Sequence, residues 1–129
     1  MMPLLVLAAA SADLDTLDQA VARCDRASVN PTFAAEAARR TQFLLDAYRE
    51  QEAIVAARAD LRERRRILRE SPKPSAADDK ALSLEEAALE DRQKALNDTR
   101  MLEAIRQDAM DTMRRYFLAN CPAGKDVGK

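Results

Sequence analysis

Two cysteines, Cys24 and Cys121, are the residues of this chain best suited to covalent chemistry, because together they can form a disulfide. An even number of cysteines in a small exported protein usually forms such bonds. The two lie toward opposite ends of the 129-residue chain, so a bond between them would tie those ends together. We predict a Cys24–Cys121 disulfide formed in an oxidising compartment. Two unrelated buried thiols in a cytosolic protein are the alternative.

The chain contains no histidine, which removes the usual catalytic bases and many metal sites. Histidine is the base of serine and cysteine triads and a ligand in the common zinc and helical di-iron centres. Both glycines lie in the last six residues, so no glycine-rich turn can hold a nucleophile or a phosphate. We therefore expect no catalytic residue, no cofactor and no metal, which means that the protein is not an enzyme.

Charged residues cluster in the middle of the chain. The arginine-rich run at 61–69 (LRERRRILR) could bind nucleic acid, but the chain has 21 basic and 22 acidic residues, whereas nucleic-acid-binding domains are strongly basic. We expect these arginines to pair with acids on a neighbouring helix, Arg65 near Glu85 and Arg62 near Glu86. Glu90 and Asp91 complete this acidic group. No binding of nucleic acid is predicted.

The N-terminal residues resemble a secretory signal peptide. An apolar run at 4–10 (LLVLAAA) leads into Ala10-Ser11-Ala12, a small-x-small pattern typical of a cleavage site, although the usual N-terminal basic residue is missing. The run is too short to span a bilayer, which takes ~20 residues. We interpret residues 1–12 as a signal peptide and predict a periplasmic or secreted protein without a stable membrane span. An apolar turn packed on the domain, or an uncleaved anchor, is the alternative.

Composition and prolines predict three helices. Strong helix formers dominate, and no window alternates apolar and polar residues as a strand would. Proline suits a first helical turn but breaks a helix interior, so the prolines after the leader divide the chain. The expected helices are 13–28, 31–70 and 76–120, with N-terminal caps at Asn30 and Ser75. They form one domain, residues 13–121, followed by a flexible tail at 122–129.

Seven-residue spacing predicts that the two long helices pair as an antiparallel, coiled-coil-like hairpin. Folding the chain about Ser75 aligns apolar residues of one helix with apolar residues of the other. The aligned pairs are Leu68–Leu82, Leu61–Leu89, Ile54–Leu96, Leu44–Ile105 and Phe33–Phe117. The repeat is expected to end after Leu96, where the apolar residues change phase to Leu102, Ile105, Ala109, Met113 and Tyr116 with Phe117.

The first helix carries one apolar stripe, which has to be buried on the base of the hairpin. The stripe consists of Leu14, Leu17, Val21 and Cys24. The predicted fold is therefore all-α, with a short N-terminal helix packed on the base of a long antiparallel two-helix hairpin. In shape it resembles the arms of periplasmic holdase chaperones of the Skp class, which clasp unfolded outer-membrane proteins. The strand-rich trimerisation body of those proteins has no counterpart here.

Four large apolar residues lie off the predicted seam, and such residues on a long helix usually contact another chain. They are Val55, Ile67, Leu84 and Met101. We therefore expect an exported helical interaction protein, acting as an adaptor, scaffold or holdase-like chaperone through its helix surfaces. It would form a homo-oligomer, with a dimer favoured, or bind a protein partner. The alternative is a cytoplasmic helical regulator or small toxin-system component with reduced cysteines.

Overall fold

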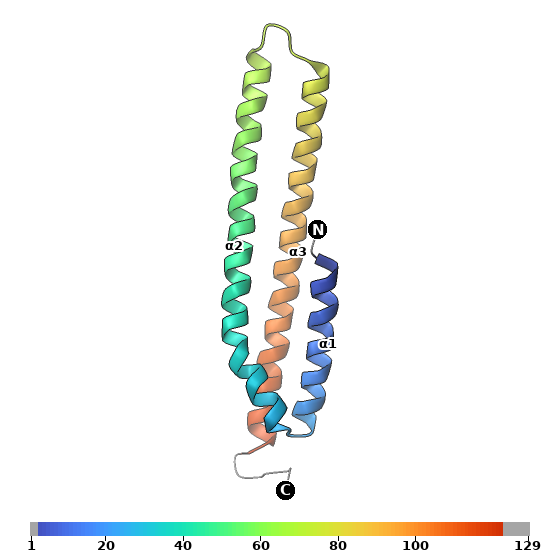
Figure 1. Cartoon of the computed structure of the whole chain (residues 1–129), viewed down its shortest axis with the longest axis vertical. Coiled ribbons are helices and arrows are strands. Elements are labelled where there is room, and N and C mark those ends of the chain that lie inside the picture. Colours follow the sequence, from blue (N-terminus) through green and yellow to red (C-terminus); the bar gives the residue numbers. More distant parts are fainter. Residues whose placement is uncertain (1–2, 123–129) are drawn as a thin grey trace. The chain divides into compact units, whose positions relative to one another are not determined.

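The computed structural model describes residues 3–122, with side chains from residue 13 onward. Within that range the chain consists of three helices without strands: α1 (Pro3–Ala22), α2 (Arg26–Glu70) and α3 (Ala76–Asn120), shown in Figure 1. The predicted all-α hairpin with a short N-terminal helix is confirmed. The first two residues of the predicted signal peptide, and the predicted tail beyond Pro122, lie outside the described residues.

The helices form two compact units. Unit 1 contains Met1–Phe43 and Met101–Lys129, and unit 2 contains Leu44–Arg100. Helices α2 and α3 run antiparallel in each unit, and α1 belongs to unit 1. Each unit has its own buried residues, so each is described by itself.

The end of α1 differs from the prediction, which placed it at Ser28. Helix α1 ends at Ala22, and Cys24 adopts a left-handed conformation with φ of 53°. The Asp25 N–H donates to the Ala20 carbonyl at 2.9 Å, and the Cys24 N–H donates to the Val21 carbonyl at 3.1 Å. These two bonds form a Schellman motif, in which N–H groups just beyond the helix bond to carbonyls of its last turn.

The start of α2 also differs from the prediction, because its cap is Asp25 and not Asn30. The Asp25 carboxylate accepts hydrogen bonds from the N–H and the hydroxyl of Ser28, at 3.3 and 2.8 Å. An aspartate in this position satisfies a free N–H of the first turn, as Asn30 was expected to do. Pro31 therefore lies inside α2, where it cannot donate a backbone hydrogen bond, and Figure 1 shows a bend in this blue-to-cyan part of the helix.

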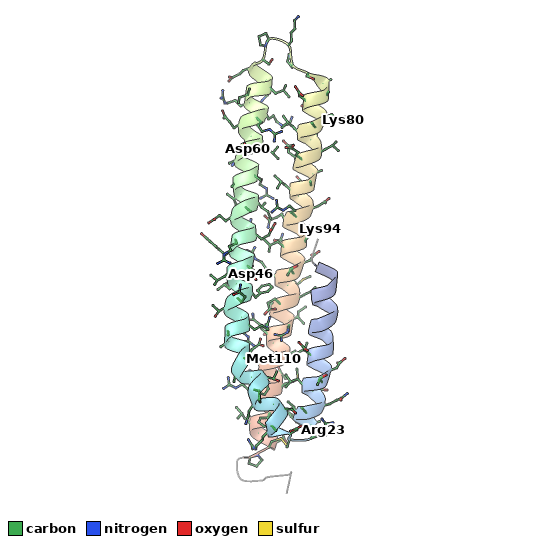
Figure 2. The ribbon with its side chains drawn as sticks, in the orientation of Figure 1. Arg23, Asp46, Asp60, Lys80, Lys94 and Met110 are labelled. Atoms are coloured by element: carbon green, nitrogen blue, oxygen red, sulfur yellow. A yellow bond between two sulfur atoms is a disulfide. The ribbon has the colours of Figure 1, made fainter. Side chains whose placement is uncertain are left out.

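The core of unit 1 lies where α1 meets α2 and α3. Phe33 and Phe117 form the predicted pair, with ring centroids 6.3 Å apart. Met110, labelled in Figure 2, is 2% exposed and belongs to this core. The predicted stripe of α1 packs here as expected. The buried members are Leu17, Ala20, Val21, Val29, Met110, Phe117 and Cys121, and Leu14, Cys24, Phe33 and Met113 pack against them.

Unit 2 contains the predicted leucine seam between α2 and α3. Leu61, Leu82 and Leu89 form one buried cluster, against which Leu68 packs. Ile54 and Leu96 are also buried. At the turn between the helices the Asp78 N–H donates to the Ser75 hydroxyl at 3.3 Å, which confirms the predicted cap of α3.

The predicted change of phase after Leu96 is wrong. Buried residues of α3 continue at seven-residue spacing, and Glu103 takes the place that a leucine holds elsewhere in the repeat. Leu44 and Ile105, expected as a pair, are 69% and 59% exposed and are not core residues. The buried residues of α3 are Leu82, Leu89, Leu96, Glu103, Met110 and Phe117. A buried glutamate interrupts the apolar pattern of the sequence while the geometric repeat persists.

Candidate functional site

The disulfide predicted from the sequence joins Cys24 and Cys121, whose Cα atoms are 5.5 Å apart. It links the turn after α1 to the residue that follows α3. Both sulfur atoms are bonded, so the described residues contain no free thiol. The bond therefore closes unit 1 and leaves no cysteine for nucleophilic chemistry.

Arg26, the first residue of α2, lies against the end of α3. Its guanidinium donates to the carbonyl of Cys121 and lies 5.1 Å from the centroid of the Phe117 ring. A cation over an aromatic face is attracted by the ring quadrupole, and a basic group stabilises the free carbonyls at a helix end. Arg26 and the disulfide thus hold the start of α2 and the end of α3 together.

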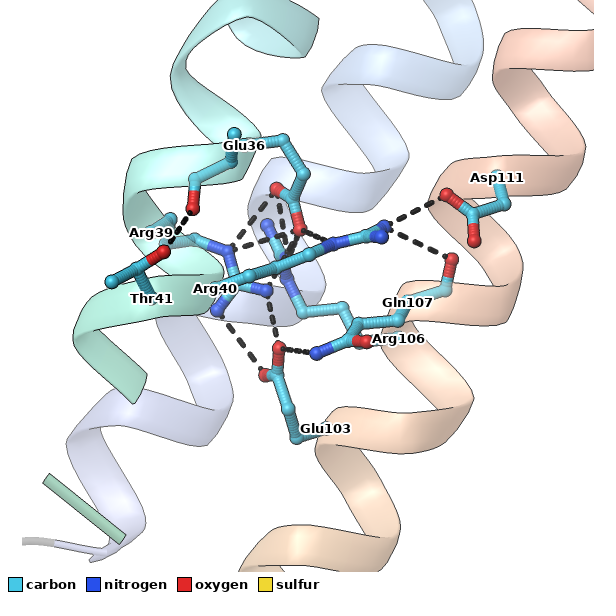
Figure 3. Close-up of polar contacts among 9 residues, drawn as sticks. Glu36, Arg39, Arg40, Thr41, Glu103, Arg106, Gln107 and Asp111 are labelled. Carbon is cyan, nitrogen blue, oxygen red and sulfur yellow. Dashed lines mark hydrogen bonds and ion pairs between the residues drawn. The ribbon is translucent and has the colours of Figure 1, made fainter. Parts of the chain in front are cut away.

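A buried carboxylate, Glu36, is the centre of the largest polar network in unit 1 (Figure 3). Its side chain accepts hydrogen bonds from three arginines, Arg39 at 2.8 Å, Arg40 at 3.0 Å and Arg106 at 2.8 Å. Glu36 is only 8% exposed, so its charge is largely removed from water. Burial of this kind is tolerated when the charge is paired and its hydrogen bonds are made.

Glu103 extends the network along α3. It is also 8% exposed, and it accepts hydrogen bonds from Arg39 and from the Gln107 amide, the latter at 2.9 Å. Arg40 reaches Asp111 at 2.9 Å. Every buried side-chain nitrogen or oxygen of the described residues has a hydrogen-bond partner. The network therefore joins α2 to α3 through satisfied charges rather than through a reactive, unpaired group.

The network changes the acidity of its members. Burial on its own would raise the pKa of Glu36, but hydrogen bonds from Arg39, Arg40 and Arg106 outweigh it and lower this pKa to about 2. Burial on its own would also raise the pKa of Glu103, but hydrogen bonds from Arg39 and Gln107 outweigh it and lower this pKa. Both carboxylates are thus held ionised at neutral pH, which suits a structural ion pair and not a general acid.

The arginine-rich run at 61–69 is paired with acids, as the sequence predicted. The individual partners differ from the prediction: Glu85 bonds to Arg64 at 2.5 Å and not to Arg65, and Glu86 bonds to Arg65 at 2.8 Å and not to Arg62. Arg66 pairs along its own helix with Glu63 and Glu70. The run is therefore a network of ion pairs in unit 2 and not an uncompensated basic patch.

Three further observations bear on metal binding, membranes and small ligands. Among the described residues no three side chains of the His, Cys, Asp or Glu types converge as a metal site would require. None of the helices in that range combines the length and the apolar character needed to cross a bilayer. A hollow of about 260 Å³ in unit 1, lined in part by Leu17, Arg106 and Met110, is near the lower limit of ligand-binding pockets, roughly 300 Å³.

Exposed apolar side chains are the remaining candidates for a functional surface. In unit 2, Leu44, Tyr48 and Val55 follow one side of α2 at helical spacing, and each is more than half exposed. We call these three residues the α2 stripe. In unit 1, Met101, Ile105 and Tyr116 follow one side of α3 in the same way and form the α3 stripe. Repeated apolar exposure on one helix face indicates a binding surface.

The four interaction residues predicted from the sequence are all exposed but do not form one continuous strip. Val55 belongs to the α2 stripe and Met101 to the α3 stripe. Val55 follows the buried Ile54, whereas Ile67 precedes Leu68, so these two lie on opposite flanks of the seam. Their exposed fractions are 52% for Val55, 56% for Ile67, 63% for Leu84 and 58% for Met101.

Reasoning from the sequence missed the network around Glu36 and Glu103. A signal was present for Glu103, because position 103 continues the spacing of Leu82, Leu89 and Leu96. Burial of a glutamate at that position depends on Arg39 arriving from another helix, which spacing alone does not show. Comparison with known proteins identifies no matching protein family, no similar curated protein and no similar solved structure.

Proposed function

We propose that this chain is an exported helical protein that binds other proteins through apolar helix surfaces, as an adaptor, scaffold or holdase-like chaperone. The observation that carries the proposal is the α2 stripe. Leu44, Tyr48 and Val55 are exposed on one side of α2, whereas its seam residues Ile54 and Leu61 are buried. Large apolar side chains aligned in this way are used for protein contacts more often than for solubility or stability.

Export is supported by the cysteine pair and by the leader. The Cys24–Cys121 disulfide would persist in the periplasm or outside the cell, where thiols are oxidised, and would be reduced in the cytosol. The apolar run at 4–10 and the pattern Ala10-Ser11-Ala12 would direct the chain there. We propose that the mature protein begins at Asp13.

A holdase role fits the chemistry of the α2 stripe. Unfolded chains expose short apolar segments, and a row of separated apolar side chains can contact them without a preformed pocket. Charged residues flank the stripe, since Arg49 and Glu52 lie between its members in the sequence. Such flanking charges limit self-aggregation of the stripe while leaving it accessible to a client.

The test compares two glutamate substitutions on α2 in the mature protein. A urea-unfolded β-barrel membrane protein is diluted into buffer with each variant, and aggregation is followed by light scattering. Wild type should suppress aggregation, Val55→Glu in the stripe should abolish most of the suppression, and Ala56→Glu should retain it. Ala56 is the matched control because it is exposed and is the next residue of the same helix. Equal behaviour of the two variants would contradict a role for the stripe.

A further inference from the structure

A groove lies along one flank of the seam in unit 2, on the side away from Val55. It has a volume of about 230 Å³, and its apolar lining comes from Leu61 and Leu89 of the core and from Ala57 and Ala88 at its edges. Leu61 and Leu89 are only 5% and 7% exposed, and the alanine methyl groups at the edges of the groove project little beyond the backbone. The groove therefore offers apolar surface where another helix could approach closely.

An ion pair between α2 and α3 stands toward each end of this groove. At one end Arg92 bonds to Glu50 at 2.7 Å, and at the other Arg64 bonds to Glu85 at 2.5 Å. Glu50 and Arg64 are each seven residues from Ala57, so all three lie on the same side of α2. These ion pairs place one acid and one base of each helix on this flank, in opposite order along the groove. Asp60, which also lines the groove, lies 3.5 Å from Arg64.

This charge pattern is complementary to itself. If two copies face each other across the groove with their helix pairs parallel, α2 of one copy lies on α3 of the other. Glu50 of one copy then faces Arg92 of the other, and Arg64 faces Glu85, so each pair becomes a group of four alternating charges. A two-fold axis brings identical surfaces together in this way, and at these four positions unlike charges are opposed. An antiparallel pairing would also set Glu50 against Arg64 and Arg92 against Glu85, and the crosslinking test below distinguishes the two orientations.

We propose that this groove is the docking surface for a second copy of the chain, in a parallel two-fold dimer. The two alanine edges would allow close contact between helices, and the contact would cover the alanine methyl groups and complete the burial of Leu61 and Leu89. Ile67 supports the assignment, because it lies one heptad beyond the groove-lining Asp60 and is 56% exposed. A partner of one charge sign would meet repulsion at two of the four charges of these ion pairs, whereas a second copy sets an opposite charge against each of the four.

The inference goes beyond the proposed function, because it assigns a different surface to self-association. Asp60 and Ile67 each precede a seam leucine, and Val55 follows a seam isoleucine, so groove and α2 stripe lie on opposite flanks. A dimer formed through the groove would leave the α2 stripes of both copies available for a protein partner.

The first test is the molar mass of the mature protein by light scattering, over about a hundredfold range of concentration. Wild type should approach twice the monomer mass. Ala88→Glu, which places a charge in the groove, should raise the dimer dissociation constant about tenfold or more, while Ala87→Glu should change it less than about threefold. Both positions are exposed, and circular dichroism of each variant checks that the helices are retained. A monomer throughout, or equal effects of the two substitutions, would overturn the proposal.

The second test fixes the orientation with engineered cysteines, which would be the only free thiols of the described chain. Ala57→Cys and Ala88→Cys are purified separately, mixed and mildly oxidised. A parallel dimer should yield a disulfide-linked heterodimer of the two variants and little linked product from Ala57→Cys alone. Efficient crosslinking of Ala57→Cys with itself would overturn the parallel arrangement. A monomer that still suppresses client aggregation would overturn this inference while leaving the proposed function intact.

Discussion

At the scale of single residues, Glu36 shows how this chain buries charge. Three arginines surround one carboxylate that is almost inaccessible to water, and two of the three come from its own helix. Such a site stabilises the fold only when every charge in it has a partner, because removing one group leaves the others buried without compensation. Glu36 is therefore expected to be more important for stability than any exposed ion pair of unit 2.

Glu36→Gln should lower the free energy of unfolding by roughly 3 kcal/mol, because it leaves Arg39, Arg40 and Arg106 without their shared carboxylate. Urea unfolding followed by circular dichroism at pH 7 measures the change. The matched control is Glu63→Gln, which removes an exposed carboxylate paired with Arg66 on the same helix and should have little effect. Equal losses in the two variants would show that Glu36 is not a special site.

Stability should also depend on pH through Glu36. Its pKa is about 2 in the folded protein, against an ordinary value of 4.5, so the folded state favours the ionised form. The resulting stabilisation is fully present above pH 4.5 and is lost as the pH falls from 4.5 toward 2. The shift corresponds to a free energy on the order of 3 kcal/mol. Unfolding measured between pH 7 and pH 2.5 should show this loss, and Glu36→Gln should reduce its slope. If the stability of Glu36→Gln falls with decreasing pH as steeply as that of wild type, other carboxylates cause the acid sensitivity.

At the scale of helices, the turn between α1 and α2 depends on a cysteine in an unusual conformation. Cys24 has positive φ at the position of a Schellman motif that glycine normally occupies. A residue with a Cβ is less stable than glycine in this left-handed conformation, and the disulfide to Cys121 holds Cys24 in place. The covalent bond and the helix end are thus coupled in unit 1.

Removing the disulfide should separate the stability that the covalent bond contributes from the cost of a positive φ at residue 24. The bond spans 97 residues of sequence, and loop-closure entropy predicts a stabilisation of ~4–5 kcal/mol for a loop of that order. Cys24→Ser with Cys121→Ser should lose most of it. Cys24→Gly with Cys121→Ser should be more stable than the double serine variant by about 1 kcal/mol, because glycine accepts positive φ. Thermal unfolding of the two variants gives the comparison, and no advantage for glycine would mean that the turn rearranges once the bond is gone.

The seam of unit 2 depends on leucines that meet across α2 and α3. Leu61→Ala should cost ~3 kcal/mol, since Leu61 is 5% exposed and packs against buried Leu82 and Leu89. Leu84→Ala is the matched control, because Leu84 is an exposed leucine of the same unit. Urea unfolding should show a small effect for Leu84→Ala. A small effect for Leu61→Ala would mean that unit 2 opens before unit 1 unfolds.

At the scale of the whole molecule, the chain combines nearly balanced charge with apolar surface on both of its units. The net charge of −1 arises from 21 basic and 22 acidic residues, and many of them form ion pairs between α2 and α3. Specificity for a partner therefore has to come from apolar stripes and from the order of charges, because long-range attraction by net charge is weak.

The compartment can be tested in cells by alkylating free thiols before lysis. In an exported protein Cys24 and Cys121 should resist alkylation unless a reductant is added first, because the oxidising compartment keeps them bonded. Mass spectrometry of the intact protein reads both the thiol state and the N-terminus, which should be Asp13 after cleavage of the leader. Two alkylated cysteines on a chain that retains residues 1–12 would favour the cytoplasmic alternative.

The sequence by itself determined the helical hairpin, its register in unit 2, the cap at Ser75 and the pairing of Cys24 with Cys121. These features are local or periodic. Seven-residue spacing specifies which leucines face each other, and a capping serine acts on residues three positions away. Such signals are readable because each depends on the chain's own order and not on what a distant segment brings.

Only the tertiary structure decided which of the competing local signals were used. Asp25 and Asn30 could both cap a helix, and the turn closed by the Cys24–Cys121 bond selects Asp25. Glu103 is buried because Arg39 and Gln107 supply its hydrogen bonds, whereas an isolated glutamate would have stayed in water. The groove between Ala57 and Ala88 likewise exists only once two helices lie side by side. The free energy of a buried charge or an open groove depends on partners distant in sequence, and the fold alone brings these together.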